Sequence, residues 1–275
     1  GWLRQSDGVP GQRHASLPNR QQARVPRFIV AHVQEEPLMS IRVGVAGWSI
    51  PSALAGRFPS EGTHLERYGA CLSAVEINSS FYRPHRRATY ERWAASVPPG
   101  FRFSVKLPRT ITQFARLVNT EDLLDGFFEQ VAGLGAKLGR CVVQLPPSLV
   151  FDAVVADRFF AALRERADRT GLACEPRHAS WGTAEADALL RAHRVARIAA
   201  DPPRFEADAR PGGSRPAYWR LHGSPRMYRD AYDAGTLRQL ETRLRRGDWV
   251  IFDNTAEGHA IANALELRSL HASCV

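Results

Sequence analysis

The chain has 275 residues, of which 44% are hydrophobic, and its formal net charge at pH 7 is +9. This length suits one large α/β domain or two smaller ones. No apolar run approaches the roughly 20 residues needed to cross a bilayer, so we expect neither a transmembrane helix nor a membrane partner.

The basic charge is spread along the chain, and its densest run is only the segment 243–246. Only two of the 37 basic residues are lysines, Lys106 and Lys137. This pattern is more typical of a biased arginine usage than of a nucleic-acid surface, although nucleic acid stays an alternative partner. Lys106 stands out, because a desolvated lysine can lose its proton and an arginine cannot. Chance retention of the lysine is the alternative.

The cysteines are scattered at positions 71, 141, 174 and 274, and none forms a C-x-x-C pair. This spacing argues against a zinc ribbon or a redox motif. It fits a reducing compartment, so we expect a cytoplasmic protein.

Residues 1–38 differ from the rest of the chain, because they are rich in Gly, Pro, Gln and Arg and show no sustained period. The short apolar run at 28–31 lacks the layout of a signal peptide. Met39 directly precedes the first regular strand. We interpret 1–38 as an unstructured leader or a mis-called extension, and 39–275 as the folded domain.

From Ile41 onward, short apolar segments alternate with segments of helical period. The expected strands are 41–48, 74–78, 101–107, 141–145, 172–177, 195–201, 217–222 and 249–253. The expected helices are 64–72, 89–97, about 120–134, 154–167, 184–193, 235–246 and 258–270, with a long loop at 202–216. In the helix that opens at Thr120, we expect Leu123, Phe127, Val131 and Leu134 to form the buried face.

Strands that alternate with helices imply a parallel sheet, and eight of them favour a single (β/α)8 TIM barrel with an irregular N-terminal extension. A doubly wound open sheet is the rival. Neither a G-x-G-x-x-G motif after the first strand nor a P-loop is present.

In a TIM barrel, the loops after the carboxyl ends of the strands build the active site. Here every expected strand ends in polar or aromatic residues: Trp48, Glu76, Asn78, Lys106, Gln144, Glu175, Arg177, His178, Asp201, Arg220, His222, Asp253 and Asn254. The set predicts a binding site at this end of the barrel. For any single member, a layer of internal ion pairs is the alternative.

The catalytic candidates are Glu76 and Glu175 as acid and base, with Lys106 and His222 as their partners. Arg177 and Arg220 suit a phosphate or carboxylate group. The full set of substrate-binding candidates is Trp48, Asn78, Tyr82, Gln144, Arg177, His178, Trp181, Asp201, Arg220 and Asn254.

The aromatic members of this set are suited to stacking a sugar ring or a base, and packing beneath the loops is their alternative. Acidic and histidine side chains at the strand ends also offer a divalent metal its ligand types. No H-E-x-x-H or comparable spacing supports a metal, so the sequence implies no cofactor and leaves a metal as an alternative.

Several motifs occur in an order that resembles the YecE-like family, a domain of unknown function, over residues 41–270. They are Gly44-x-x-Gly-Trp-Ser49, Glu76-Ile-Asn-Ser-Ser-Phe-Tyr82, Lys106, Ile111-Thr112, Gln144-Leu-Pro-Pro-Ser148, Glu175-x-Arg-His-x-Ser-Trp181, Arg220-Leu-His-Gly223 and Asn254-Thr255. The resemblance implies a TIM barrel and no established activity. Its characteristic positions fall on Glu76, Asn78, Lys106, Gln144, Glu175, Arg177, His178, Arg220, His222 and Asn254.

The chain departs from the family pattern in three places. Gln113 stands where a histidine is usual, the segment 50–54 replaces an aromatic first loop, and Asp253 replaces an asparagine. We therefore expect no acid or metal role at position 113.

Three functional hypotheses follow from the sequence. The first is an enzyme, a hydrolase or a lyase/isomerase, that uses general acid–base chemistry on an anionic, phosphate-bearing small molecule. The second is a nucleic-acid-binding barrel or phosphodiesterase, whose binding falls steeply with salt. The third is a non-catalytic binding protein, in which the carboxylates at the strand ends satisfy one another's charge through ion pairs.

Overall fold

The computed structural model describes residues 41–273. The expectations for residues 1–38 and for Cys274 lie outside this range. The central strands are β1 (Arg42–Ala46), β2 (Ala74–Ile77), β3 (Arg102–Lys106), β4 (Leu138–Gln144), β5 (Gly171–Glu175), β6 (Val195–Arg197), β7 (Ala199–Asp201), β9 (Tyr218–Leu221) and β10 (Trp249–Phe252). The hydrogen-bonded order is β7-β9-β10-β1-β2-β3-β4-β5-β6, and all of these pairs are parallel.

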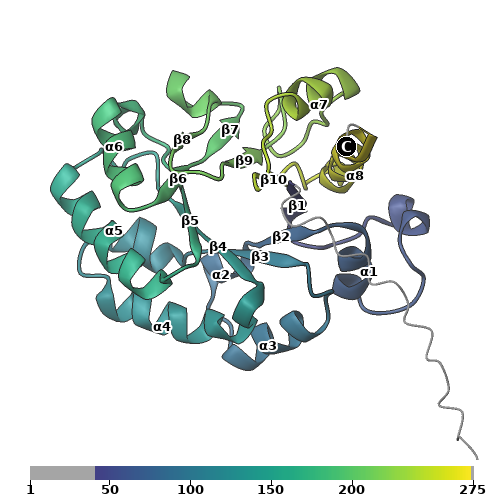
Figure 1. The fold of residues 1–275 in the computed structure, drawn as a ribbon, viewed down its shortest axis with the longest axis horizontal. Helices are drawn as coiled ribbons and strands as arrows, with labels where there is room; N and C mark the ends of the chain where they lie inside the picture. Colours follow the sequence, from purple (N-terminus) through teal and green to yellow (C-terminus); the bar gives the residue numbers. More distant parts are fainter. Residues whose placement is uncertain (1–40, 274–275) are drawn as a thin grey trace, which may run out of the picture. The chain divides into compact units, whose positions relative to one another are not determined.

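The ring of strands closes through the segment that we predicted as one strand, 195–201. Its first half, β6, pairs with β5, and its second half, β7, pairs with β9. Between the two halves, Ile198 N donates to Cys174 O at 2.8 Å. Because both halves belong to one continuous segment, the sheet is a (β/α)8 barrel rather than an open doubly wound sheet (Figure 1). The predicted TIM barrel is confirmed.

Helices surround the ring of strands in Figure 1. The longer ones are α1 (His64–Cys71), α3 (Arg87–Ala95), α4 (Glu121–Val131), α5 (Ala153–Ala167), α6 (Ala184–Ala192), α7 (Ala234–Glu241) and α8 (His259–Ser273). The connection after the sixth barrel strand holds only the 3-10 turn η5 (Glu206–Ala209) and β8 (Gly212–Gly213), in agreement with the predicted loop. Within 41–273, no helix is both long and apolar enough to cross a membrane.

Shorter helical segments lie in the loops. They are η1 (Ser52–Arg57), α2 (Ser79–Tyr82), the π-helical η2 (Thr110–Phe114), η3 (Ala132–Lys137) and η4 (Ala179–Gly182). Helix boundaries follow local capping chemistry. At the start of α1, Thr63 N donates to Glu66 Oε2 at 2.7 Å and Glu66 N donates to Thr63 Oγ1 at 3.3 Å, which is a capping box.

The buried face of α4 differs from the expected one. Leu123 is 41% exposed, whereas Leu124, Phe127 and Val131 are buried. Residues at i, i+3 and i+7 share one side of a helix, and here that side begins at Leu124. Thr120 stands at the N-cap position, but its side chain makes no capping bond.

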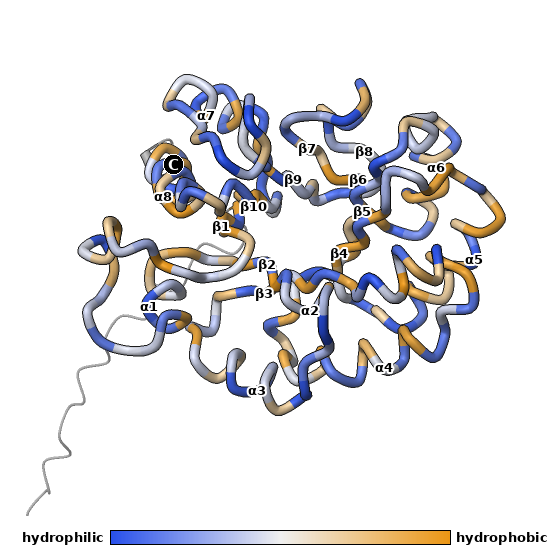
Figure 2. Tube along the Cα trace, turned by 180° about the vertical axis from the view of Figure 1, so that it is seen from behind, coloured by the Kyte–Doolittle hydropathy of each residue, from blue (hydrophilic) through white to orange (hydrophobic). Residues whose placement is uncertain are grey.

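The core has an outer and an inner part. The outer part packs the strands against the helices, and hydrophobic colouring recurs along strands such as β1 and β4 in Figure 2. The inner part fills the barrel and consists of Ala74, Val142, Ala173, Ala196, Ile198, Tyr218, Trp249 and Ile251. Successive strand residues point to opposite faces, so the residues two positions beyond these inner side chains also point into the barrel.

Candidate active site at the barrel mouth

A polar layer covers the apolar interior of the barrel. Glu76, Gln144, Glu175, Arg220 and Asp253 each stand two positions after an inward-facing member of the inner core. Period-2 alternation therefore directs all of them inward, at the carboxyl ends of their strands. Five of the side chains that we predicted at the mouth of the barrel meet there for this reason.

Arg220 is the centre of this layer, and it is fully buried. Its Nη2 donates to Glu76 Oε1 at 2.7 Å and to Asp253 Oδ2 at 2.9 Å, and its Nη1 donates to Glu175 Oε2. A buried guanidinium needs such pairing to offset the loss of hydration. Arg220 thus pairs with three carboxylates, and its terminal nitrogens are not left free for the substrate anion that we expected it to hold.

The two predicted acid–base carboxylates are held tightly and are at most 1% exposed. Glu76 Oε2 also accepts a hydrogen bond from Tyr218 Oη at 2.8 Å, and Glu175 Oε1 accepts one from Arg177 Nε at 2.9 Å. Burial by itself would raise the pKa of Glu175, but Arg220 and His222 hold that pKa well below its usual value. Glu175 is therefore a carboxylate over the physiological pH range.

His222 connects two of the carboxylates. Its Nδ1 lies 3.1 Å from Asp253 Oδ2, and its Nε2 lies 3.3 Å from Glu175 Oε1. Burial would lower the pKa of His222, but the two carboxylates outweigh this effect and raise it. For Asp253, burial is likewise outweighed by Arg220 and His222, which lower its pKa. The imidazole is thus poised to carry a proton beside Asp253.

Above the polar layer lies a cavity of about 540 Å³, within the size range of small-molecule sites. Its walls come from the segments that follow several different strands of the barrel. They are formed by Asn78, Phe81, Tyr82, Lys106, Gln113, Gln144, Leu145, Pro146, Pro147, Arg177, Tyr228, Asp253 and Thr255. Of the three carboxylates that pair with Arg220, Asp253 is the one that lines this cavity.

Lys106, the last residue of β3, lines the cavity and is 7% exposed. Its Nζ lies 4.1 Å from the centroid of the Phe81 ring, and no hydrogen bond or ion pair joins it to any of the residues 41–273. Burial and the charge of Arg220 lower the pKa of Lys106 to about 8, although the nearby carboxylates oppose this. The amine therefore titrates close to neutral pH.

Two amide side chains present unpaired polar atoms. Asn78 Oδ1 and Gln144 Oε1 are buried and have no hydrogen-bond partner in the described part of the chain. Both residues line the cavity, where a ligand would supply the missing donors. Gln113, on the π-helical turn η2, donates from Nε2 to Gln144 O at 3.2 Å and so fixes the wall beside it.

The two tryptophans among the predicted site residues lie away from the cavity. Trp48 follows the end of β1 and packs edge to face on Trp93 of α3, with ring centroids 5.0 Å apart. Trp181 is 1% exposed and donates from Nε1 to Leu149 O at 3.0 Å, so it takes the packing alternative rather than stacking a substrate. Tyr82 does line the cavity and is 66% exposed.

The three remaining candidates have structural partners outside the cavity. His178 caps η4 by accepting from Ser180 N, and Asp201 accepts a hydrogen bond from Tyr232 Oη at 3.0 Å. Asn254 is buried and donates to Asn263 Oδ1 at 3.0 Å. These residues hold the loops that surround the cavity.

Tyr228 is a cavity residue that sequence reasoning missed. It is partly exposed, its ring lies 5.5 Å from that of His222, and its φ of 68° is unusual for a bulky residue. Its position in the loop after the strand that carries Arg220 was the available signal. That loop has no periodicity that would single out Tyr228.

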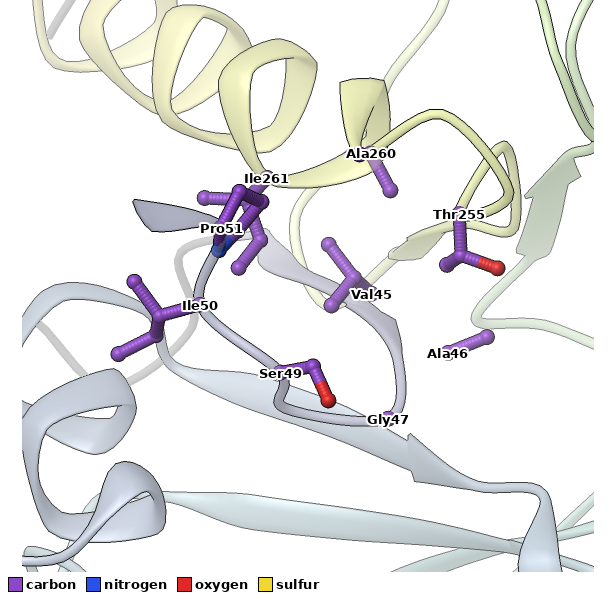
Figure 3. A pocket seen from close by; sticks show the side chains of 10 residues that line it. Val45, Ala46, Gly47, Ser49, Ile50, Pro51, Thr255, Ala260 and Ile261 are labelled. Atoms are coloured by element: carbon purple, nitrogen blue, oxygen red, sulfur yellow. The ribbon is translucent and has the colours of Figure 1, made fainter. Parts of the chain in front are cut away.

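A second cavity of about 380 Å³ lies beside the first and shares Thr255 with it. Figure 3 shows it between the loop after β1 and the start of α8, with Ser49 and Thr255 among largely apolar neighbours. Over residues 41–273, no three His, Cys, Asp or Glu side chains are grouped as metal ligands. Glu76 and Glu175, two of the acidic side chains at the strand ends, are engaged by Arg220.

A closed ring of parallel strands with a polar cavity at the carboxyl ends defines a protein of the TIM-barrel class. More narrowly, the chain belongs to the DUF72 family, described as "Protein of unknown function DUF72", which matches residues 42–273. The family resemblance predicted from the sequence is confirmed.

Relatives of known sequence or structure support this assignment. The UPF0759 protein YecE of Escherichia coli strain K12 is 30% identical over 106 residues, which is 38% of either chain. A DUF72 family protein from Enterococcus faecalis has a TM-score of 0.72 at 19% identity, over 85% of this chain and 96% of its own. One from Thermotoga maritima has a TM-score of 0.67 at 24% identity, over 84% and 98%. The structural likenesses concern the fold.

Proposed function

We propose that this protein is an enzyme that acts on a small anionic substrate by acid–base chemistry in the cavity at the barrel mouth. The observation that carries the proposal is the environment of Lys106. The Lys106 side chain is only 7% exposed and lines the cavity, yet its amine has neither a hydrogen bond nor an ion pair among the described residues. A desolvated, unpaired amine destabilises a fold, and functional sites are where such groups are retained.

The non-catalytic hypothesis expected the carboxylates at the strand ends to be mutually satisfied, and Arg220 does satisfy Glu76, Glu175 and Asp253. That hypothesis does not explain why Lys106 is a lysine, because an apolar residue at this position would cost no ion pair. We therefore favour the enzyme hypothesis.

The charge of the cavity favours an anion. Lys106 and Arg177 both line it, and Arg177 uses its Nε for Glu175. The Nη2 of Arg177 lies 3.5 Å from Tyr228 Oη, and Nη1 has no such partner among the described residues. A planar guanidinium is well suited to binding a carboxylate or phosphate. Gln144 and Asn78, with their unpaired oxygens, would accept hydrogen bonds from hydroxyl or amine groups of the substrate.

Proton transfer is best assigned to the cavity-lining groups. Asp253 reaches the cavity with His222 hydrogen-bonded behind it, and the pKa of Lys106 near 8 suits proton exchange at neutral pH. Glu76 and Glu175, the acid and base expected from the sequence, are paired with Arg220 and do not line the cavity. We reassign them to positioning Arg220 and His222.

A thermal-shift screen of phosphorylated and carboxylated metabolites tests the proposal. We expect a subset of anions to raise the melting temperature of the wild type, and Lys106→Met to lose this response. Lys137→Arg is the matched control, because Lys137 donates to Ala94 O and Val97 O and does not line the cavity. The active ligands are then followed by NMR for turnover. The proposal fails if no anion shifts the wild type or if Lys106→Met responds equally.

A second candidate function is the binding of single-stranded nucleic acid, and one surface feature favours it. Arg109 lies between two exposed rings next to the cavity, 5.8 Å from the ring of Tyr82 and 5.4 Å from that of Phe114. Aromatic and arginine side chains of this kind stack nucleic-acid bases. Anisotropy of a labelled oligonucleotide at several salt concentrations tests it, and affinity that is independent of salt or of Tyr82→Ala rejects it.

A further inference from the structure

Lys106 is the buried titratable group that anion binding alone does not explain. The chain uses arginine for every other basic position except Lys137, whose amine donates to two backbone carbonyls. An arginine would serve equally well as a fixed positive charge at the barrel mouth. A lysine instead offers a primary amine, which can become neutral and use its lone pair.

We propose that Lys106 is a nucleophile that forms an imine with an aldehyde or ketone group of the anionic substrate. This inference rests on the proposed function of the same cavity and names its substrate class, a small carbonyl compound that carries a carboxylate or phosphate. In this arrangement Lys106 bonds to the carbonyl carbon of the substrate, Arg177 binds its anionic group, and Asp253 transfers protons.

The surroundings of Lys106 match those of an activated amine. Its Nζ lies over the Phe81 ring and beside the cavity, and no carboxylate in the described range pairs with it. A lysine is activated as a nucleophile when an apolar neighbour desolvates it and a second cation stands nearby. Arg220 is that second cation, and its charge together with burial lowers the pKa of Lys106 to about 8. Roughly a tenth of the amine is then neutral at pH 7.

The covalent step is balanced without an oxidant or reductant. The lone pair of the neutral amine forms a bond to the carbonyl carbon as the carbon–oxygen π bond breaks, and one amine proton moves to the oxygen to give a carbinolamine. The second amine proton then moves to the hydroxyl group, the carbon–oxygen bond breaks, and water leaves, so that both protons of the water come from the nitrogen. Asp253 lines the same cavity with His222 at 3.1 Å behind it, so this pair is placed to carry the proton.

Reductive trapping tests the imine on the full chain. The wild type is incubated with glyoxylate, pyruvate or glyceraldehyde 3-phosphate and sodium cyanoborohydride, and the label is mapped by peptide mass spectrometry. Because Lys106 and Lys137 are the only lysines in the sequence, mapping separates them directly. We expect about tenfold or more label on Lys106 relative to Lys137 at pH 7, because the Lys106 amine lines the cavity whereas Lys137 Nζ donates to Ala94 O and Val97 O. We also expect the rate to rise toward pH 8 and to fall when inorganic phosphate occupies the cavity.

The outcomes separate this inference from the proposed function. Label on Lys106 with at least one probe supports the imine, whereas label spread evenly over both lysines and the terminal amine, or no label on Lys106 at pH 9, overturns it. Lys106→Arg should lose the label and Lys137→Arg should keep it. If anions shift the wild type in a Lys106-dependent way but no probe is trapped, the anion site stands and the imine falls. Should Lys106→Arg fail to fold, mapping on the wild type still decides.

Discussion

Arg220 and Glu76 are 144 positions apart in the sequence, and their side chains meet at 2.7 Å inside the barrel. They come from β9 and β2, which are not neighbours in the sheet. Since the same guanidinium also bonds Glu175 and Asp253, one cation joins the carboxyl ends of four strands. The polar layer that forms the floor of the candidate site therefore also holds the strands of the barrel together.

Removal of the central cation should unfold the barrel more readily. Arg220→Met leaves three buried carboxylates without the cation that they share, and we expect a loss of about 3–5 kcal/mol in the free energy of unfolding. Urea denaturation followed by circular dichroism measures it. Arg229→Met is the control, because Arg229 is exposed and lies 3.3 Å from Glu257, and such surface pairs contribute at most about 1 kcal/mol. Equal effects of the two substitutions would contradict the role of Arg220.

Replacement of Lys106 should stabilise the protein. The folded-state pKa of about 8 lies below the unfolded value of about 10.4, so the folded state binds this proton less tightly. The destabilisation is absent above the unfolded pKa, grows as the pH falls from about 10.4, and is complete below about 8. Lys106→Met removes it, and we expect a gain of up to about 3 kcal/mol at pH 7 that vanishes toward pH 10.5.

Urea unfolding of wild type and Lys106→Met at pH 7, 8.5 and 10 checks this prediction. Lys137→Met serves as the comparison, and we expect it to destabilise because it removes the donor to Ala94 O and Val97 O. A loss of stability in Lys106→Met at pH 7 would contradict the prediction, because it would mean that the charged amine makes a net stabilising interaction in the folded protein.

His222 should contribute a stabilisation with the opposite pH dependence. Its carboxylate partners raise its folded pKa above the unfolded value of about 6.5. The contribution is complete below about pH 6.5 and is lost as the pH rises through the folded pKa. The difference in melting temperature between wild type and His222→Gln should therefore shrink as the pH is raised from 6 to 9. A difference that stays constant over this range would argue that His222 is neutral in the folded protein.

Gly44 is required for the approach of β1 to β2. A Cβ atom at this position would overlap the carbonyl oxygen of Ala74, which already accepts a hydrogen bond from Tyr68 Oη at 2.8 Å. We expect Gly44→Ala to lower the free energy of unfolding by about 1–3 kcal/mol or more, the range typical of overpacking. Gly56→Ala, where a Cβ meets no atom within 4 Å, should leave the melting temperature almost unchanged. An unchanged melting temperature for Gly44→Ala would contradict this close approach.

The class of the fold and the region of the site were predictable from the amino-acid sequence alone. Strand and helix periods are local signals, and they predicted the alternation that closes into a barrel. Polar residues at the strand ends predicted the mouth of the barrel, and the rarity of lysine drew attention to Lys106 before any contact was known. The segment 195–201 was identified as one strand, but its division between two neighbours depends on how the ring closes.

The tertiary structure decided which polar residues are the floor of the site and which line the cavity. Strands of a parallel barrel are buried on both faces, so their sequences do not reveal which side chains point inward. Inward direction and strand register brought Arg220 against three carboxylates and left Asp253 and Lys106 at the cavity. Trp181 is packed beneath a loop and Tyr228 lines the cavity for a related reason, because contacts between segments distant in sequence set both positions.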